Sequence, residues 1–65
     1  MKEKEHYLIE ERVVMDKRRN IEILVGAERA VFEYVRRVYP DKVHFECRKI
    51  SKKAAEMYGI KEHYL

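Results

Sequence analysis

The chain has 65 residues, which allows one domain over residues 1–65 and leaves little room for a Rossmann or P-loop cofactor fold. It carries 15 Lys and Arg against 12 Asp and Glu, and 46% of its residues are hydrophobic, which excludes the pattern of a disordered chain. No apolar run approaches the roughly 18 residues of a membrane span, and residues 1–5 lack the apolar stretch of a signal peptide. We therefore expect a soluble cytoplasmic protein with no membrane partner.

The composition is similar to that of hyperthermophile proteins. Gln, Thr and Trp are absent, whereas Lys, Arg and Glu account for 25 of the 65 residues, and such a bias towards ion-pairing residues marks thermophilic proteins. A small domain has a small core, and the single Cys47 excludes an intramolecular disulfide. Ion-pair networks and self-association remain as sources of stability, and a homodimer is one hypothesis that follows.

In chain order, the first element is the least decisive. Tyr7, Ile9 and Val13 share one face of a strand, and β-branched and aromatic residues favour that structure. The alternative is a long helix over residues 3–15. We predict the strand, followed by a polar hairpin loop at residues 16–20.

The hydrophobic period then changes from 2 to 3.6 and back to 2. The alternating stretches, residues 20–25 and 42–50, predict strands, and the stretch between them predicts a helix over residues 27–39 that ends at Pro40. The expected inward sets are Ile21, Ile23 and Val25 in the first strand and Val43, Phe45 and Cys47 in the second. A strand, a helix and a strand on short connections form a crossover, so these two strands should run in the same direction.

Ser51 is the expected N-cap of a short helix over residues 52–58, which stops at Gly59. The predicted fold is α+β, a small two-layer ββαβα domain. Its three-stranded, mainly antiparallel sheet has the order 2-1-3 and packs against one long helix, with a short C-terminal helix after it. The alternative is a reduced β-grasp arrangement, in which residues 60–65 return as a central strand beside the first.

Residues 50–60, with the paired Ala54 and Ala55 and a Gly-Ile turn, resemble the first helix and turn of a helix-turn-helix DNA-binding unit. Only five residues follow Ile60, which is too few for the recognition helix of that family. The resemblance therefore carries no function over to this chain.

The pentapeptide Lys-Glu-His-Tyr-Leu occurs twice, at residues 4–8 and 61–65. Five residues are too few for a structural repeat unit, and coincidence or local bias is one interpretation. The other is that both copies are edge or terminal strands that pair with each other or across a dimer axis.

Two basic runs are candidates for binding phosphate groups. They supply the predicted nucleic-acid-binding residues, Lys17, Arg18, Arg19, Arg48, Lys49, Lys52 and Lys53. The predicted topology places residues 17–19 at the end of the sheet opposite residues 48–53. The alternative interpretation is a solvated surface that Glu22, Glu46 and Glu56 balance.

No catalytic, metal or cofactor site is expected. His44 and Cys47 are three apart and would point to opposite faces of a strand, so they would not converge on a zinc ion. Cys47 alternates with apolar residues as a buried side chain does, and Tyr34 and Tyr58 lie on apolar helix faces as core residues. The two isolated glycines form no phosphate-binding loop, and no small-molecule ligand is evident.

Two classes of function follow from the sequence. The first is a small non-catalytic binding protein that associates with nucleic acid through the basic runs, which fits a pI near 9.1. The second is a homodimeric or protein-interaction accessory domain with no nucleic-acid role, which fits the small size and the mixed surface charge.

Overall fold

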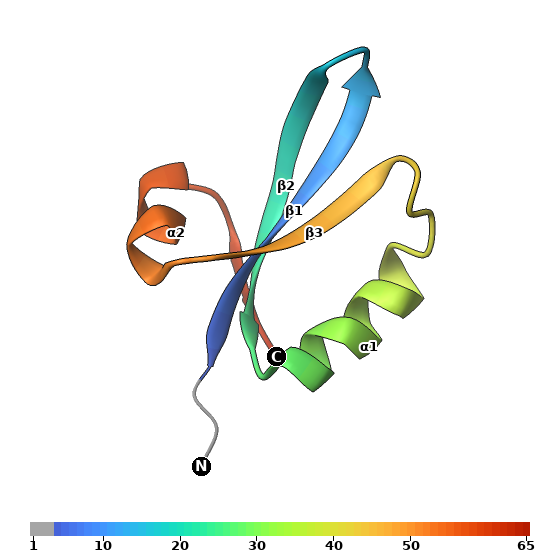
Figure 1. The fold of residues 1–65 in the computed structure, drawn as a ribbon. Helices are drawn as coiled ribbons and strands as arrows, with labels where there is room; N and C mark the ends of the chain where they lie inside the picture. Colours follow the sequence, from blue (N-terminus) through green and yellow to red (C-terminus); the bar gives the residue numbers. More distant parts are fainter. Residues whose placement is uncertain (1–3) are drawn as a thin grey trace.

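The computed structural model describes residues 4–65. Its elements are β1 (Glu5–Val14), β2 (Lys17–Gly26), α1 (Glu28–Val38), β3 (Phe45–Ile50), α2 (Lys52–Tyr58) and β4 (Glu62–Tyr64). The strands form one mixed sheet in the order β3-β1-β2-β4 (Figure 1). The α+β class and the two helices are confirmed, but the prediction of three strands lacked β4. Among residues 4–65, neither helix has the length and apolar content needed to cross a membrane.

The predicted order 2-1-3 of the first three strands is confirmed. β1 pairs antiparallel with both β2 and β3, so β2 and β3 run in the same direction, and β4 adds to the far side of β2 as a parallel strand. The β-grasp alternative is wrong, because the C-terminal strand lies at an edge of the sheet beside β2 and not in the centre beside β1.

The two helices lie on opposite faces of the sheet (Figure 1). The connection through α1 leads from β2 to β3, and the connection through α2 leads back from β3 to the opposite edge. Crossovers of one hand that move in opposite directions across a sheet place their helices on opposite faces. The predicted two-layer arrangement is therefore wrong, and the fold has three layers.

Each face of the sheet has its own apolar cluster. The cluster under α1 contains Tyr7, Ile9, Leu24 and Val31, and the cluster under α2 contains Leu8, Ile23, Val25 and Ala55. β1 is thus buried on both faces at residues 7–10 and β2 at residues 22–26, and continuous apolar runs are typical of such segments.

A β-bulge in β2 changes which residues share a face. Ile9 lies opposite Glu22 and Glu10 lies opposite Asn20, so Ile21 is an extra residue in the strand. A bulge re-aims the side chains next to it. Ile21 packs against the α1 cluster, whereas Ile23 belongs to the α2 cluster, so the predicted shared face is wrong.

The hairpin between β1 and β2 turns tightly and projects beyond both helices (Figure 1). Its turn comprises only Met15 and Asp16, and Asp16 has a φ of 60°, a conformation that aspartate tolerates. The predicted loop at residues 16–20 is wrong, because β2 begins at Lys17. The helical alternative for residues 3–15 is also wrong for β1, and residue 3 lies outside the described residues.

The third strand begins later than predicted. The Asp41 carboxylate accepts hydrogen bonds from the backbone N–H groups of Val43 and His44, at 2.9 and 3.1 Å. Such a turn is characteristic of aspartate. Residues 42–44 therefore form a turn, and the strand predicted over 42–50 is confirmed only for Phe45–Ile50.

The predicted start and end of α2 are confirmed. The Ser51 hydroxyl accepts a hydrogen bond from the Ala54 N–H at 3.0 Å, and Gly59 ends the helix with a φ of 63°. The chain then enters β4 rather than a second helix, so the likeness to a helix-turn-helix unit ends at the turn.

The repeated pentapeptide flanks β2 on both sides. Residues 6–8 pair antiparallel with the segment Ile23 to Val25, and residues 62–64 pair parallel with the same segment. The two copies therefore do not pair with each other, and only the second lies at an edge of the sheet.

Candidate interaction surface

The open side of β3 is the longer of the two sheet edges. β3 pairs with β1 on one side through an unbroken register from Glu11–Phe45 to His6–Ile50, and no strand among residues 4–65 lies on its other side. A regular edge strand presents unpaired N–H and C=O groups that another chain can pair with. The outer backbone groups of β3 therefore have no strand partner among residues 4–65.

An apolar groove of about 530 Å³ lies between α1 and β3. Phe32, Val35 and Tyr39 line it from the helical side, and Phe45 and Cys47 line it from the strand. Arg36 and Lys42 also line it. The α1 side of β3 is therefore open along an apolar surface next to the free edge.

One large apolar side chain of this groove is well exposed. Phe32 lines the groove and is 56% exposed, and it lies on the opposite wall from Phe45 and Cys47 of β3. Val38 and Val43 are also exposed, but neither lines the groove. Single exposed apolar residues need no explanation, so Phe32 is the exposed apolar residue that belongs to this surface.

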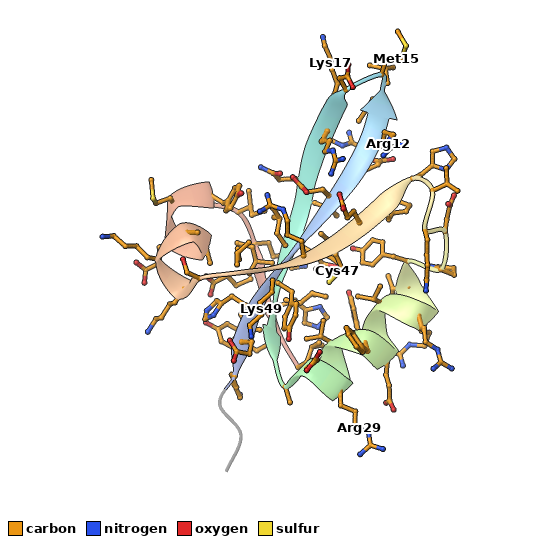
Figure 2. All side chains as sticks on the ribbon, in the orientation of Figure 1. Arg12, Met15, Lys17, Arg29, Cys47 and Lys49 are labelled. Carbon is orange, nitrogen blue, oxygen red and sulfur yellow. The ribbon has the colours of Figure 1, made fainter. Side chains whose placement is uncertain are left out.

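Cys47 lies on β3 and faces the groove (Figure 2). It is a free cysteine of intermediate exposure that packs against the α1 cluster. Burial raises the pKa of its thiol above the usual value, which disfavours the nucleophilic thiolate. This agrees with its expected role as a small apolar side chain.

Four of the seven predicted phosphate-binding residues form ion pairs within the chain. Arg18 contacts Glu46 and Glu10, Arg19 contacts Glu11, Arg48 contacts Glu10, and Lys49 contacts Glu5. The carboxylates that balance the basic runs are thus largely those of β1, which the sequence interpretation did not include. No ion pair with a described residue is found for Lys17, Lys52 or Lys53.

The structure does not bring the two basic runs together. Arg18 lies opposite Arg12 of β1, and Lys49 lies opposite Tyr7 of β1. Tyr7 and Arg12 are five positions apart, which is about 17 Å along the strand. Figure 2 shows Lys17 at the hairpin tip and Lys49 in β3, well apart. The predicted separation of the runs is confirmed, although residues 17–19 belong to a strand and not to a loop.

A buried polar cluster under α1 was missed by the sequence analysis. Glu22, expected on a solvated surface, is only 8% exposed and accepts hydrogen bonds from the hydroxyls of Tyr34 and Tyr39. His63 of β4 lies 3.2 Å from the Tyr34 hydroxyl and 3.7 Å from Glu22 Oε1. Burial, and secondly the hydrogen bond to Glu22, raises the pKa of both tyrosines.

The available signal for this cluster was the pair of tyrosines, because a buried phenol normally finds a hydrogen-bond partner. Its members satisfy one another, and no buried side-chain N or O atom in the described residues lacks a partner. The cluster therefore fastens β4 and α1 to β2.

The described residues contain no group of three or more His, Cys, Asp and Glu side chains able to hold a metal ion. The sequence analysis placed His44 on a strand, but His44 lies in the turn before β3. Its Nδ1 is 2.7 Å from Asp41 Oδ2. The hydrogen bonds to His44 and Val43 lower the pKa of Asp41. This contact orders the turn that leads into β3.

Comparison with protein-family models, with curated proteins and with solved structures finds no match to this chain.

Proposed function

We propose that the chain is a small non-catalytic binding protein that acts as a homodimeric interaction domain, with the open edge of β3 and the adjoining groove as its interface. The observation that carries this proposal is the unpaired, regular six-residue strand beside a groove lined by Phe32, Phe45 and Cys47. A second copy would supply both the backbone partner and the apolar cover.

The small core favours a second copy as the partner. The buried apolar residues of the chain are Tyr7, Leu8, Ile9, Ile23, Leu24, Val25, Val31 and Ala55. A core of this size supports a domain of this length only narrowly, and self-association is one of the ways in which such domains gain stability. Each copy would contribute the same apolar groove to the shared interface.

The test is the mass in solution over a range of concentrations, measured by sedimentation equilibrium. We expect a species of twice the 8.0 kDa chain mass at micromolar concentrations. Phe32→Asp places a charge in the groove and should raise the dimer dissociation constant at least about tenfold. The matched control is Met57→Asp, because Met57 lies on α2 and is 82% exposed. A wild-type mass of 8.0 kDa at all concentrations would reject the proposal.

Nucleic-acid binding is the second candidate, and one observation favours it. Lys49, Lys52 and Lys53 follow one another where β3 leads into α2, and the first turn of α2 contains no acidic residue. Phosphate contacts of this kind give sequence-independent binding that weakens steeply with salt.

Fluorescence anisotropy with single-stranded and duplex oligonucleotides at about 50 and 200 mM salt tests this second candidate. Binding through these lysines should weaken on raising the salt and on introducing Lys52→Glu with Lys53→Glu. The control is Lys17→Glu at the distant hairpin tip. Absence of binding at the lower salt concentration, or equal loss in both variants, would reject this role for residues 49–53.

A further inference from the structure

The hydrogen-bonding pattern shows which backbone groups of β3 face β1. The Arg12 N–H donates to the His44 carbonyl at 2.7 Å, and hydrogen-bonded pairs alternate with non-hydrogen-bonded pairs along an antiparallel ladder. In the observed register the backbone groups of Glu46 and Arg48 therefore face β1 as well.

The backbone groups of the alternate residues point to the open edge. Cys47 and Lys49 present both an N–H and a carbonyl there. The Phe45 N–H donates to the Asp41 carbonyl at 3.1 Å, so Phe45 offers only its carbonyl to another chain. The open edge thus has a regular set of donors and acceptors centred on Cys47.

Symmetry restricts how a second copy can pair with this edge. Two identical strands that pair antiparallel are related by a two-fold axis perpendicular to the sheet, and this axis keeps each face of the sheet on the same side. Directly opposed residues must share a face. The axis therefore passes midway between one residue of β3 and the same residue of the second copy. We call this residue the centre of the pairing, and only the six residues of β3 are candidates.

The charges of β3 distinguish these centres. A pairing centred on Glu46, Arg48 or Lys49 sets two like charges directly opposite each other, which is destabilising. A centre at either end of β3 pairs only part of the strand. A pairing centred on Cys47 sets Glu46 of each copy opposite Arg48 of the other, and Phe45 opposite Lys49. It also pairs all three residues whose backbone groups point outwards.

We propose that the homodimer forms by antiparallel pairing of β3 with β3 of a second copy, in the single register that places the two Cys47 residues opposite each other on the two-fold axis. This inference rests on the proposed function and adds its geometry. Hydrogen-bonded pairs of antiparallel strands have Cα atoms about 5.5 Å apart, so the two thiols meet on the α1 side of one continuous sheet.

The same register extends an ion-pair network that each copy already contains. Glu46 contacts Arg18, and Arg48 contacts Glu10. Pairing Glu46 with the second copy's Arg48 links these contacts into one row of alternating charges across the interface. On the other face, the Lys49 side chain of one copy lies beside the Phe45 ring of the other, and the two apolar grooves adjoin.

The deciding experiment is charge complementation, read as mass by sedimentation. Glu46→Arg alone and Arg48→Glu alone each set like charges opposite one another and should each weaken the dimer at least about tenfold. An equimolar mixture of the two variants should restore a dimer, because positions 46 and 48 are then both basic in one chain and both acidic in the other. Circular dichroism checks that both variants are folded.

A second measurement needs only the wild-type chain, which has one cysteine. Diamide oxidises two Cys47 thiols to one disulfide, and the two electrons and two protons released reduce the N=N bond of diamide to a hydrazine. The reaction is run at about pH 8.5, because burial raises the pKa of the thiol. We expect a dimer band that a reducing agent removes. The variant C47A/M57C, which carries its thiol on α2, is the control and should not cross-link.

A wild-type protein that is monomeric overturns the proposed function and this inference together. A wild-type dimer that shows neither restored pairing in the mixture nor a Cys47 cross-link overturns the register alone. The two measurements could disagree about the register. In that case the result of the mixture is decisive if both charge variants are folded, and the result of the cross-link is decisive if either variant is unfolded.

Discussion

The two edges of the sheet are built differently. The β4 edge is three residues long. His63 of β4 contacts Tyr34, and Leu65, the residue after β4, packs against the α1 cluster and approaches Gly26, whereas Tyr64 is exposed. The β3 edge is six residues long, has no bulge in its pairing with β1, and borders an apolar groove. Short edges are a common protection against further pairing. β4 therefore covers the outer side of β2 at Ile23–Val25, whereas no strand among residues 4–65 pairs with the outer side of β3.

The largest effect should come from removing the β4 edge. Deleting residues 61–65 removes the hydrogen bond from Ile23 N–H to the Lys61 carbonyl, the bond from Leu65 N–H to the Val25 carbonyl, and the packing of Leu65. We expect the free energy of unfolding to fall by about 4 kcal/mol, measured by urea denaturation at fixed protein concentration. A loss below about 1 kcal/mol would mean that β4 does not stabilise the sheet.

A pair of proline variants separates the two sides of β3. Arg48→Pro removes an N–H that faces β1, and we expect it to lower monomer stability by about 3 kcal/mol. Lys49→Pro removes an N–H that faces the open edge, so the fold should persist while dimerisation is lost. Urea denaturation and sedimentation give the two readouts. Equal destabilisation by both prolines would contradict the assigned hydrogen-bonding sides.

Alkaline pH tests the cluster that fastens the β4 edge. Burial, with the hydrogen bond to Glu22, raises the pKa of Tyr39, so the folded chain keeps this phenol protonated at pH values where the unfolded chain ionises it. The protonated phenol makes its full contribution to the free energy of unfolding below about pH 10. Above that pH the free energy of unfolding falls by at most about 1.4 kcal/mol per pH unit for each such tyrosine.

Tyr39→Phe should flatten this alkaline loss and cost about 1 kcal/mol at neutral pH, since Glu22 loses a hydrogen-bond donor. Urea denaturation of both proteins between about pH 8 and 11, on either side of the ordinary tyrosine pKa, makes the comparison. Identical alkaline slopes would show that the Tyr39 hydroxyl is not buried against Glu22.

The smallest effect should come from the exposed ion pair on β3. Lys49 Nζ lies 3.6 Å from a Glu5 carboxylate oxygen, and both side chains are well exposed. Lys49→Ala should change monomer stability by no more than about 0.5 kcal/mol, which makes it the side-chain control for Lys49→Pro. A loss above about 1 kcal/mol in urea denaturation would show that the side chain contributes more than an exposed ion pair.

Sequence analysis was sufficient for the elements whose local signals agree. The change of hydrophobic period located β2, α1 and most of β3, and Ser51 and Gly59 located the ends of α2. The direction of β2 and β3 followed from the length of the connection between them. These features depend on residues close together in the chain, where periodicity and capping act.

The features that sequence analysis missed depend on tertiary contacts. The bulge at Ile21 belongs to the pairing of β1 with β2, and buried Glu22 accepts hydrogen bonds from Tyr34 and Tyr39, which lie 12 and 17 residues further along the chain. β4 is too short for a period to be visible, and it forms because β2 offers an unpaired side. The groove beside β3 follows from where α1 packs, and the ion pairs of the basic runs follow from strand register.

Residue-resolved amide hydrogen exchange of the wild-type chain tests the central claim most directly. At concentrations where β3 is paired with a second copy, the amides of Cys47 and Lys49 should be protected to about the same degree as those of Glu46 and Arg48. Their protection should fall on dilution while that of Glu46 and Arg48 persists. Rapid exchange of the two outward amides at every concentration would contradict the account.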